Sequence, residues 1–212
     1  MNVLITAGPT REAIDPVRYL TNRSSGKMGY AIADKFCRKK HNVRLISGPV
    51  SLKAGRGIKL INVVTALEML DSVKRNIAWC DVIVMAAAVA DWRPAAVACH
   101  KIKKRKCQLM LKLVPTPDIL QTIRPFKKKR VYVGFAAETN DLIKEASRKL
   151  VEKGLDIVVA NDVSKKDSGF EVDTNRVTVI SSSGWMIQLP LMSKKQVASR
   201  LVEIIHEYVI KR

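Results

Sequence analysis

Runs of apolar residues alternate with helix-length amphipathic segments along most of this sequence, and this alternation constrains the fold more than any other feature. The strand-like runs lie at residues 3–6, 43–47, 82–86, 108–113, 131–135 and 157–160. The segments 27–39, 66–78, 117–123 and 142–153 carry apolar residues three and four positions apart, which is typical of helices. This pattern predicts a Rossmann-like α/β fold with a mostly parallel sheet and helices on both faces.

The last 45 or so residues have a different pattern. Two strand-like runs, 176–180 and 185–189, flank the sequence Ser181-Ser182-Ser183-Gly184, which predicts an antiparallel hairpin. Ser193 and Gln196 have the spacing of a capping box, so we expect a closing helix that runs through Val209. No linker or repeat divides the sequence, and its length fits a single domain over residues 1–212.

The cysteines and the N-terminus favour a cytoplasmic protein. The four cysteines form no C-x-x-C pair and have no histidine at zinc spacing, so we interpret them as reduced thiols, Cys37 and Cys80 in the core. The sequence begins directly on a strand-like run, without a basic and apolar leader, and no apolar run is long enough to cross a membrane. The sequence indicates no metal-ligand set.

A polar loop after the first strand predicts an anion site. Free N–H groups and the dipole of the helix opened by Gly26 and Gly29 favour a phosphate or carboxylate there. Met28 after Gly26 excludes a Walker P-loop, and no G-x-G-x-x-G fingerprint follows a strand. The loop supplies Arg11, Arg18, Asn22, Arg23, Ser24 and Ser25.

Small residues beside a carboxylate or amide follow three other predicted strands. The segments are 87–93, 136–140 and 161–162. Ligands of open α/β sheets bind beyond the carboxyl ends of the strands, so these segments suit a flat ligand with polar edges. An alternative stays open, because alanines at these positions also let helices pack closely on the sheet.

The formal net charge of +19 fits a polyanionic partner, and it also fits a solvated face that keeps the protein soluble. Either nucleic acid or a small polyanionic substrate fits such a charge. Aromatic residues make up only 5% and do not interleave with the basic runs, so the stacking platform of single-strand binders is missing.

Seven motifs in order resemble the phosphopantothenate–cysteine ligase family (phosphopantothenoylcysteine synthetase) of the bacterial CTP-dependent type. They are ITAGPTRE, DPVRYLTNRSSGKMG, AAVADWR, KIKK, TPDIL, VGFAAET and DIVVAND. This family often forms the C-terminal half of a bifunctional coenzyme A biosynthesis flavoprotein. The resemblance implies a homodimeric ligase, assisted by Mg²⁺ or Mn²⁺, that joins 4′-phosphopantothenate and L-cysteine through an acyl-cytidylate. CTP would be consumed to CMP and pyrophosphate.

The resemblance also implies roles for individual residues. Lys101 would be the catalytic lysine of a basic flap, and Arg18 and Asn22 would contact the acyl substrate. Asp91 would read the cytosine amino group. Spacing alone is typical of solvated lysines at Lys149 and Lys153, and only the resemblance directs them to the triphosphate. The complete nucleotide-binding set is Met85, Ala86, Ala87, Asp91, Lys101, Pro117, Asp118, Ile119, Leu120, Phe135, Lys149 and Lys153.

Two other classes of function stay open at this point. The charge fits a nucleic-acid-binding protein, and the α/β alternation fits a nicotinamide oxidoreductase, although the glycine fingerprint is absent. Nothing precedes the first strand, so the flavin-dependent half of bifunctional relatives is not expected. A free-standing ligase and an excised domain both fit. The choice between CTP and ATP, the metal ligands and the conformation of the flap, which continues as Arg105-Lys106-Cys107, are also open.

Overall fold

The computed structural model describes residues 1–104, 108–138, 141–162, 169 and 172–212, and its centre is one mixed sheet. The strand order is β12-β11-β10-β9-β6-β1-β4-β5. Six strands are parallel: β1 (Asn2–Ala7), β4 (Asn42–Ser47), β5 (Ile58–Asn62), β6 (Val82–Met85), β9 (Val131–Glu138) and β10 (Ile157–Asp162). The hairpin of β11 (Thr174–Ser181) and β12 (Met186–Ser193) extends the sheet in antiparallel fashion. The predicted α/β class and hairpin are confirmed.

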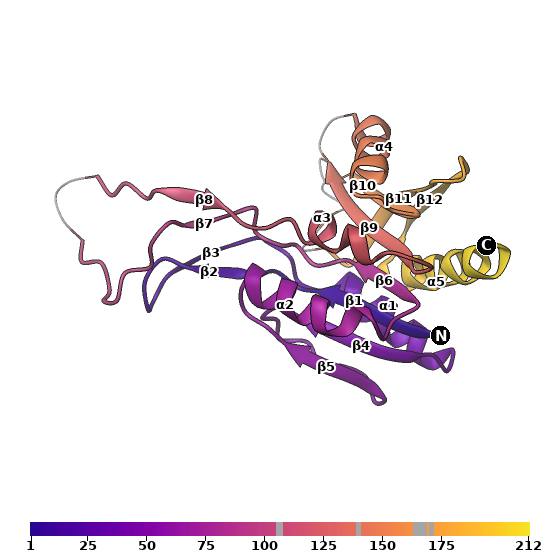
Figure 1. Cartoon of the computed structure of the whole chain (residues 1–212), viewed down its shortest axis with the longest axis horizontal. Helices are drawn as coiled ribbons and strands as arrows, with labels where there is room; N and C mark the ends of the chain where they lie inside the picture. The colour runs from indigo at the N-terminus through magenta and orange to yellow at the C-terminus, as the bar shows by residue number, and fades with distance from the viewer. Residues whose placement is uncertain (105–107, 139–140, 163–168, 170–171) are drawn as a thin grey trace.

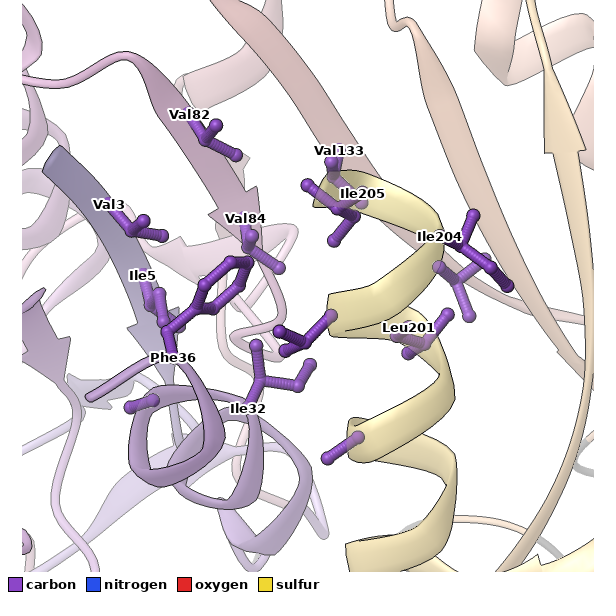
Figure 2. Packing of buried hydrophobic residues seen from close by; sticks show 14 of the residues in the cluster. Val3, Ile5, Ile32, Phe36, Val82, Val84, Val133, Leu201, Ile204 and Ile205 are labelled. Atoms are coloured by element: carbon purple, nitrogen blue, oxygen red, sulfur yellow. The ribbon is translucent and has the colours of Figure 1, made fainter. Parts of the chain in front are cut away.

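Helices cover both faces of the sheet because alternate strand residues point to opposite faces. Val3 and Ile5 of β1 pack with α1 (Lys27–Arg38) and α5 (Lys194–Lys211), as Figure 2 shows. Leu4 packs on the other face, which is covered by three helices. These are α2 (Ala66–Ile77), α3 (Ile119–Ile123) and α4 (Leu142–Glu152). Each fully buried Val, Leu or Ile side chain contributes about 1.5–3 kcal/mol.

The start of α1 lies directly against the end of β1. A Cβ added at Gly29 would lie 2.6 Å from Ala7 Cβ and 3.0 Å from the Thr6 carbonyl oxygen, so only glycine fits. Gly26, which precedes the helix, has a left-handed φ of 76° and gives α1 no side-chain cap. The N-terminal N–H groups of α1 are thereby brought close to the carboxyl edge of the sheet.

The predicted capping box is present in the structure. Ser193 and Gln196 form the complete capping box of α5, which ends at Lys211, slightly beyond the predicted Val209. The α3 helix is shorter than the predicted 117–123, because the side chain of Asp118 accepts a hydrogen bond from Gln121 N and starts the helix at Ile119.

Two antiparallel ribbons project side by side from the sheet and form an arm, here defined as residues 11–21, 92–104 and 108–115 (Figure 1). One ribbon pairs β2 (Arg11–Ala13) with β3 (Tyr19–Thr21), and the other pairs β7 (Trp92–Pro94) with β8 (Leu113–Pro115).

The prediction of a strand over residues 108–113 is wrong. Residues 108–112 have no regular structure, and β8 lies outside the central sheet. The apolar run misled the prediction because its side chains are exposed, with Met110 at 89%. The strand β5 was not predicted, and the loop expected after β1 contains the ribbon β2–β3.

Candidate active site

The loops after β1 and β6 meet at the point where the strand order reverses. The chain proceeds from β1 outward to β4 and β5, and then returns to place β6 on the other side of β1. Ala88 N donates to Gly8 O at 2.9 Å, and Thr10 N donates to Ala88 O at 3.3 Å. Because open α/β sheets bind ligands at such a switch point, this junction is the candidate site.

Two buried hydroxyl groups hold the β6 loop in place. Ala87 N donates to Thr6 Oγ1 at 3.2 Å, and Ala90 N donates to Thr10 Oγ1 at 2.9 Å. Both threonines have an exposed fraction of 0%. Sequence reasoning did not find them, and their only signal was a threonine within or just beyond a buried strand.

Asp91 presents its carboxylate from a fixed backbone. The Asp91 side chain is exposed, while its carbonyl oxygen accepts from Thr116 N at 2.9 Å. The hydroxyl of Thr116 also donates to Ala90 O. Thr116 precedes Pro117 and Asp118, so two of the predicted nucleotide-binding segments are neighbours in the structure.

Asp118 and Lys153 form an ion pair although they are far apart in the sequence. Lys153 Nζ lies 2.6 Å from Asp118 Oδ2, and the two side chains are 19% and 40% exposed. Lys149 lies one turn earlier on α4 and is half-buried. Lys149 is therefore part of α4 and Lys153 is its C-cap, and residues of α4 and α3 share the cluster on one face of the sheet.

The apolar residues predicted for the nucleotide pocket are divided between the two faces. Met85, Ala87 and Leu120 pack with the cluster under α2, α3 and α4. Ala86 and Phe135 pack with the cluster under α1 and α5. Met85 is 7% exposed and Ile119 is 4% exposed, so these two side chains form part of the core. Pro117 is exposed.

A cationic cavity of about 350 Å³ lies beside the switch point, at the start of α1. The Arg11 guanidinium stacks on the Tyr19 ring at 4.5 Å, and its buried Nε has no hydrogen-bond partner within the described residues. A buried, unpaired donor is costly and favours an anion in the cavity. The lining residues are Pro9, Arg11, Thr21, Asn22, Arg23, Ser24, Ser25, Lys27, Pro49, Val50, Ser51 and Leu52.

Asn22 connects this cavity to the β6 loop. Its Nδ2 donates to Ala88 O at 3.1 Å and to Val89 O at 3.0 Å. The amide therefore fixes the loop that carries Asp91. The resemblance assigned Asn22 to the acyl substrate, and the structure adds this backbone contact.

Arg18 and Lys101 lie together on the arm. Arg18 Nη2 donates to Asp15 Oδ2 at 2.6 Å and to Ile102 O at 2.9 Å, and the exposed Lys101 directly precedes Ile102. In Figure 1 the segment that joins β7 to β8 lies at the far end of the arm. The segment that joins β7 to β8 and the turn between β2 and β3 therefore lie away from β9 and α4 in one chain. Arg105, Lys106 and Cys107 of the predicted flap lie outside the described residues.

The described residues contain no group of three or more His, Cys, Asp and Glu side chains arranged to hold a metal. Cys37, Cys80 and Cys99 are free thiols, and burial raises the pKa of Cys80 to about 11. Within the described ranges no helix combines the length and the apolar character needed to cross a bilayer.

Comparison with known proteins places the whole chain in one group. The family model described as "DNA/pantothenate metabolism flavoprotein C-terminal domain" matches residues 1–209. The coenzyme A biosynthesis bifunctional protein CoaBC of Bacillus subtilis (strain 168) is 46% identical over 203 residues, which are 95% of this chain and 50% of that protein. CoaBC of Escherichia coli (strain K12) is 45% identical over 213 residues, 98% of this chain and 52% of that protein.

The chain thus spans about half the length of these curated relatives. A crystal structure of the C-terminal domain of CoaBC has a TM-score of 0.85 and 40% identity to this chain. The match covers 100% of this chain and 96% of that domain.

Proposed function

This chain belongs to the family of DNA/pantothenate metabolism flavoprotein C-terminal domains, and on that basis we propose that it is a phosphopantothenate–cysteine ligase. It joins 4′-phosphopantothenate to L-cysteine through an acyl-cytidylate, converts CTP to CMP and pyrophosphate, and acts as one ligase domain over residues 1–212. The observation that carries the proposal is the 40% identity, over the full chain, to the C-terminal domain of a coenzyme A biosynthesis protein.

In the first half-reaction, the carboxylate of phosphopantothenate attacks the α-phosphorus of CTP and pyrophosphate leaves. Two anions must approach each other, so cations have to offset their repulsion. The start of α1 and the Arg11 guanidinium offer positive potential at the switch point. Lys149 and Lys153 bind the triphosphate, and Lys101 stabilises the charge that develops on the transferring phosphoryl oxygens. Asp91 accepts a hydrogen bond from the cytosine amino group.

In the second half-reaction, the amine of cysteine attacks the acyl carbonyl and CMP leaves. The carbonyl oxygen gains negative charge in the tetrahedral intermediate. The neutral amide of Asn22 suits it once Nδ2 releases one of its two backbone acceptors, Ala88 O or Val89 O. Arg18 serves the initial carboxylate. Its Nε and Nη2 donate to Asp15 Oδ2, Nη2 also donates to Ile102 O, and Nη1 would contact the acid.

The divalent ion expected from the resemblance, Mg²⁺ or Mn²⁺, fits a site completed by the substrate. Mg²⁺ commonly keeps several waters and takes one or two carboxylates together with substrate phosphates. The exposed carboxylate of Asp118, next to the nucleotide-binding lysines, suits that role. When bound, the ion supplies positive charge to the phosphates.

We also propose a homodimer in which the arm of one copy covers the site of the other. Large apolar side chains gather on the arm and are exposed in the single chain, and exposed apolar patches mark interaction sites. A second copy would bury them and bring Arg18 and Lys101 to a nucleotide site. These side chains are Val17, Tyr19, Trp92, Val97, Leu109, Met110, Leu111 and Leu113.

Pyrophosphate release tests the activity. We expect release with phosphopantothenate and CTP, an acyl-cytidylate that accumulates without cysteine, and turnover once cysteine is added. ATP in place of CTP tests the choice of nucleotide. Thermal shifts with NADH and with an oligonucleotide test the two alternative classes. If neither CTP nor ATP gives pyrophosphate, the proposed ligase activity is contradicted.

Subunit mixing tests the dimer. Light scattering should give twice the chain mass of 23.7 kDa. At a CTP concentration near the wild-type KM, a mixture of Arg18→Ala and Lys153→Ala chains should be more active than either variant alone, because one site of each mixed dimer is intact. A monomer in scattering contradicts the shared site.

A further inference from the structure

A buried carboxylate organises the turn between β2 and β3 and takes no part in the chemistry described above. The side chain of Asp15 is fully buried. Its Oδ1 accepts from Val17 N and Arg18 N, both at 2.9 Å. Its Oδ2 accepts from Arg18 Nη2 at 2.6 Å and from Arg18 Nε at 3.1 Å. The guanidinium of Arg18 is therefore held in one orientation along the turn.

The same carboxylate reaches across to the segment that carries Lys101. Ile102 N donates to Asp15 Oδ2 at 3.1 Å, and Ile102 O accepts from Arg18 Nη2 at 2.9 Å. At the other end of this segment, Ala98 N donates to Ile14 O at 3.0 Å. The backbone of residues 98–102 is thus attached to the β2–β3 turn at both ends, and Lys101 lies between the two attachments.

We propose that Asp15 is a positioning residue for Lys101, which it holds in register with Arg18 on the arm. The proposal rests on the ligase function proposed above, in which Lys101 acts on the phosphoryl transfer. A lysine side chain is long and flexible, so a fixed backbone reduces the conformational entropy that is lost when the lysine reaches the reacting oxygens. The Asp15 carboxylate therefore fixes both the backbone next to Lys101 and the guanidinium of Arg18.

A carboxylate suits this role better than an amide does. The carboxylate of Asp15 accepts all of the hydrogen bonds described above, and an ionised carboxylate is acceptor-only. The Arg18 guanidinium holds the pKa of Asp15 well below its usual range, so the group stays ionised at physiological pH. An asparagine would turn an NH₂ group toward either the backbone N–H groups or the guanidinium.

The rate of acyl-cytidylate formation, followed by chemical quench at saturating CTP and phosphopantothenate, tests the proposal. Asp15→Asn should slow this step by about 10- to 100-fold and leave the KM for CTP within about twofold, because a misplaced catalytic group affects the rate more than binding. The matched control is Asp34→Asn. It removes another Asp–Arg pair, with Arg38 at 2.8 Å on α1, and should keep the wild-type rate.

A double-mutant cycle with Lys101→Gln distinguishes positioning from general structural support. At saturating phosphopantothenate, where weaker binding of the acid by Arg18 is masked, Asp15→Asn should cause little further loss in the Lys101→Gln protein if Asp15 acts through Lys101. If the fold-losses of Asp15→Asn and Lys101→Gln multiply in the double variant, the proposal is overturned. A wild-type rate in Asp15→Asn overturns it as well. A wild-type chain that forms no acyl-cytidylate refutes the ligase function instead.

Hydrogen exchange reports the attachment itself. The Ile102 N–H should exchange slowly in the wild type and faster in Asp15→Asn, while peptides of the central sheet stay unchanged. Unchanged exchange at Ile102 overturns the proposal. If Asp15→Asn does not fold, Ile102→Pro replaces it in the cycle, because it removes the donor and keeps Asp15. Ile102→Pro should then slow acyl-cytidylate formation in the same way and cause little further loss in the Lys101→Gln protein.

Discussion

Replacing Lys153 with alanine tests whether this lysine binds the nucleotide or only holds two helices together. In the structure Lys153 Nζ lies 2.6 Å from Asp118 Oδ2, and the lysine side chain is 19% exposed. If Lys153 serves the triphosphate, it exchanges the carboxylate for a phosphate oxygen when CTP binds. We therefore expect Lys153→Ala to raise the KM for CTP and to leave the KM for cysteine unchanged.

The size of the effect follows from the two contacts. A hydrogen bond to a charged group contributes about 1.5–3 kcal/mol. A partly exposed ion pair, here the one with Asp118 that must be given up, contributes about 0.2–1 kcal/mol. The difference of about 0.5–3 kcal/mol corresponds to an increase of about 2- to 150-fold in the KM for CTP. Losing the pair should lower the Tm by less than about 4 °C.

The assay is pyrophosphate release at varied CTP with the other substrates saturating. Lys144→Ala is the matched control, since Lys144 is an exposed lysine on the same helix. A KM for CTP that changes no more in Lys153→Ala than in Lys144→Ala refutes the reasoning and leaves a structural ion pair.

Four further predictions test other parts of the site and fold. Asp91→Asn should weaken CTP binding about tenfold or more in calorimetry, since a charge-assisted hydrogen bond is lost, and should spare phosphopantothenate binding; equal CTP affinity refutes the base pocket. Asn22→Asp replaces two donated hydrogen bonds with repulsion and should accumulate acyl-cytidylate in mass spectrometry even with cysteine present; normal clearance by cysteine contradicts that role. Gly29→Ala should lower stability by about 1–3 kcal/mol in denaturant titration, because the added methyl group overlaps β1; an unchanged midpoint contradicts the close approach. In a Cys107→Ser background at pH 8, iodoacetamide should label the exposed Cys99 rapidly and should not label Cys80 until the protein unfolds. Burial raises the pKa of Cys80 to about 11, which keeps its thiol protonated at this pH. Equal labelling of the two cysteines contradicts the burial of Cys80.

The central sheet could be predicted because its strands and helices are long enough to show a period. The runs at 3–6 and 82–86 lie within or close to β1 and β6, whose buried residues face both clusters. The ribbons could not be predicted, because strands of three residues show no period. The run at 108–113 failed for a related reason, since apolar character predicts burial only where another element covers it.

The sequence could predict which loops lie near the candidate site, but it could not predict the hydrogen bonds that hold those loops in place. Strand ends in a parallel sheet share one edge, so the segments around Asn22 and Asp91 were expected near each other. The groups that hold them are contacts between distant parts of the chain. Thr10 and Ala90 are 80 positions apart, and Asp15 and Ile102 are 87 apart. No local pattern marks such pairs.

The arm explains why the proposed catalytic residues fall into two groups in one chain. Asp91 and Lys153 directly follow elements that pack in the buried core, since Asp91 lies in the loop after β6 and Lys153 is the C-cap of α4. Arg18 and Lys101 are instead fixed to each other through Asp15 and Ile102, on ribbons whose apolar side chains have no cover in the single chain. An element with internal order and an uncovered apolar surface is suited to move or dock as one unit. The acid-binding and nucleotide-binding groups would then come together only when the arm is covered, which excludes water at the step that forms the reactive acyl-cytidylate.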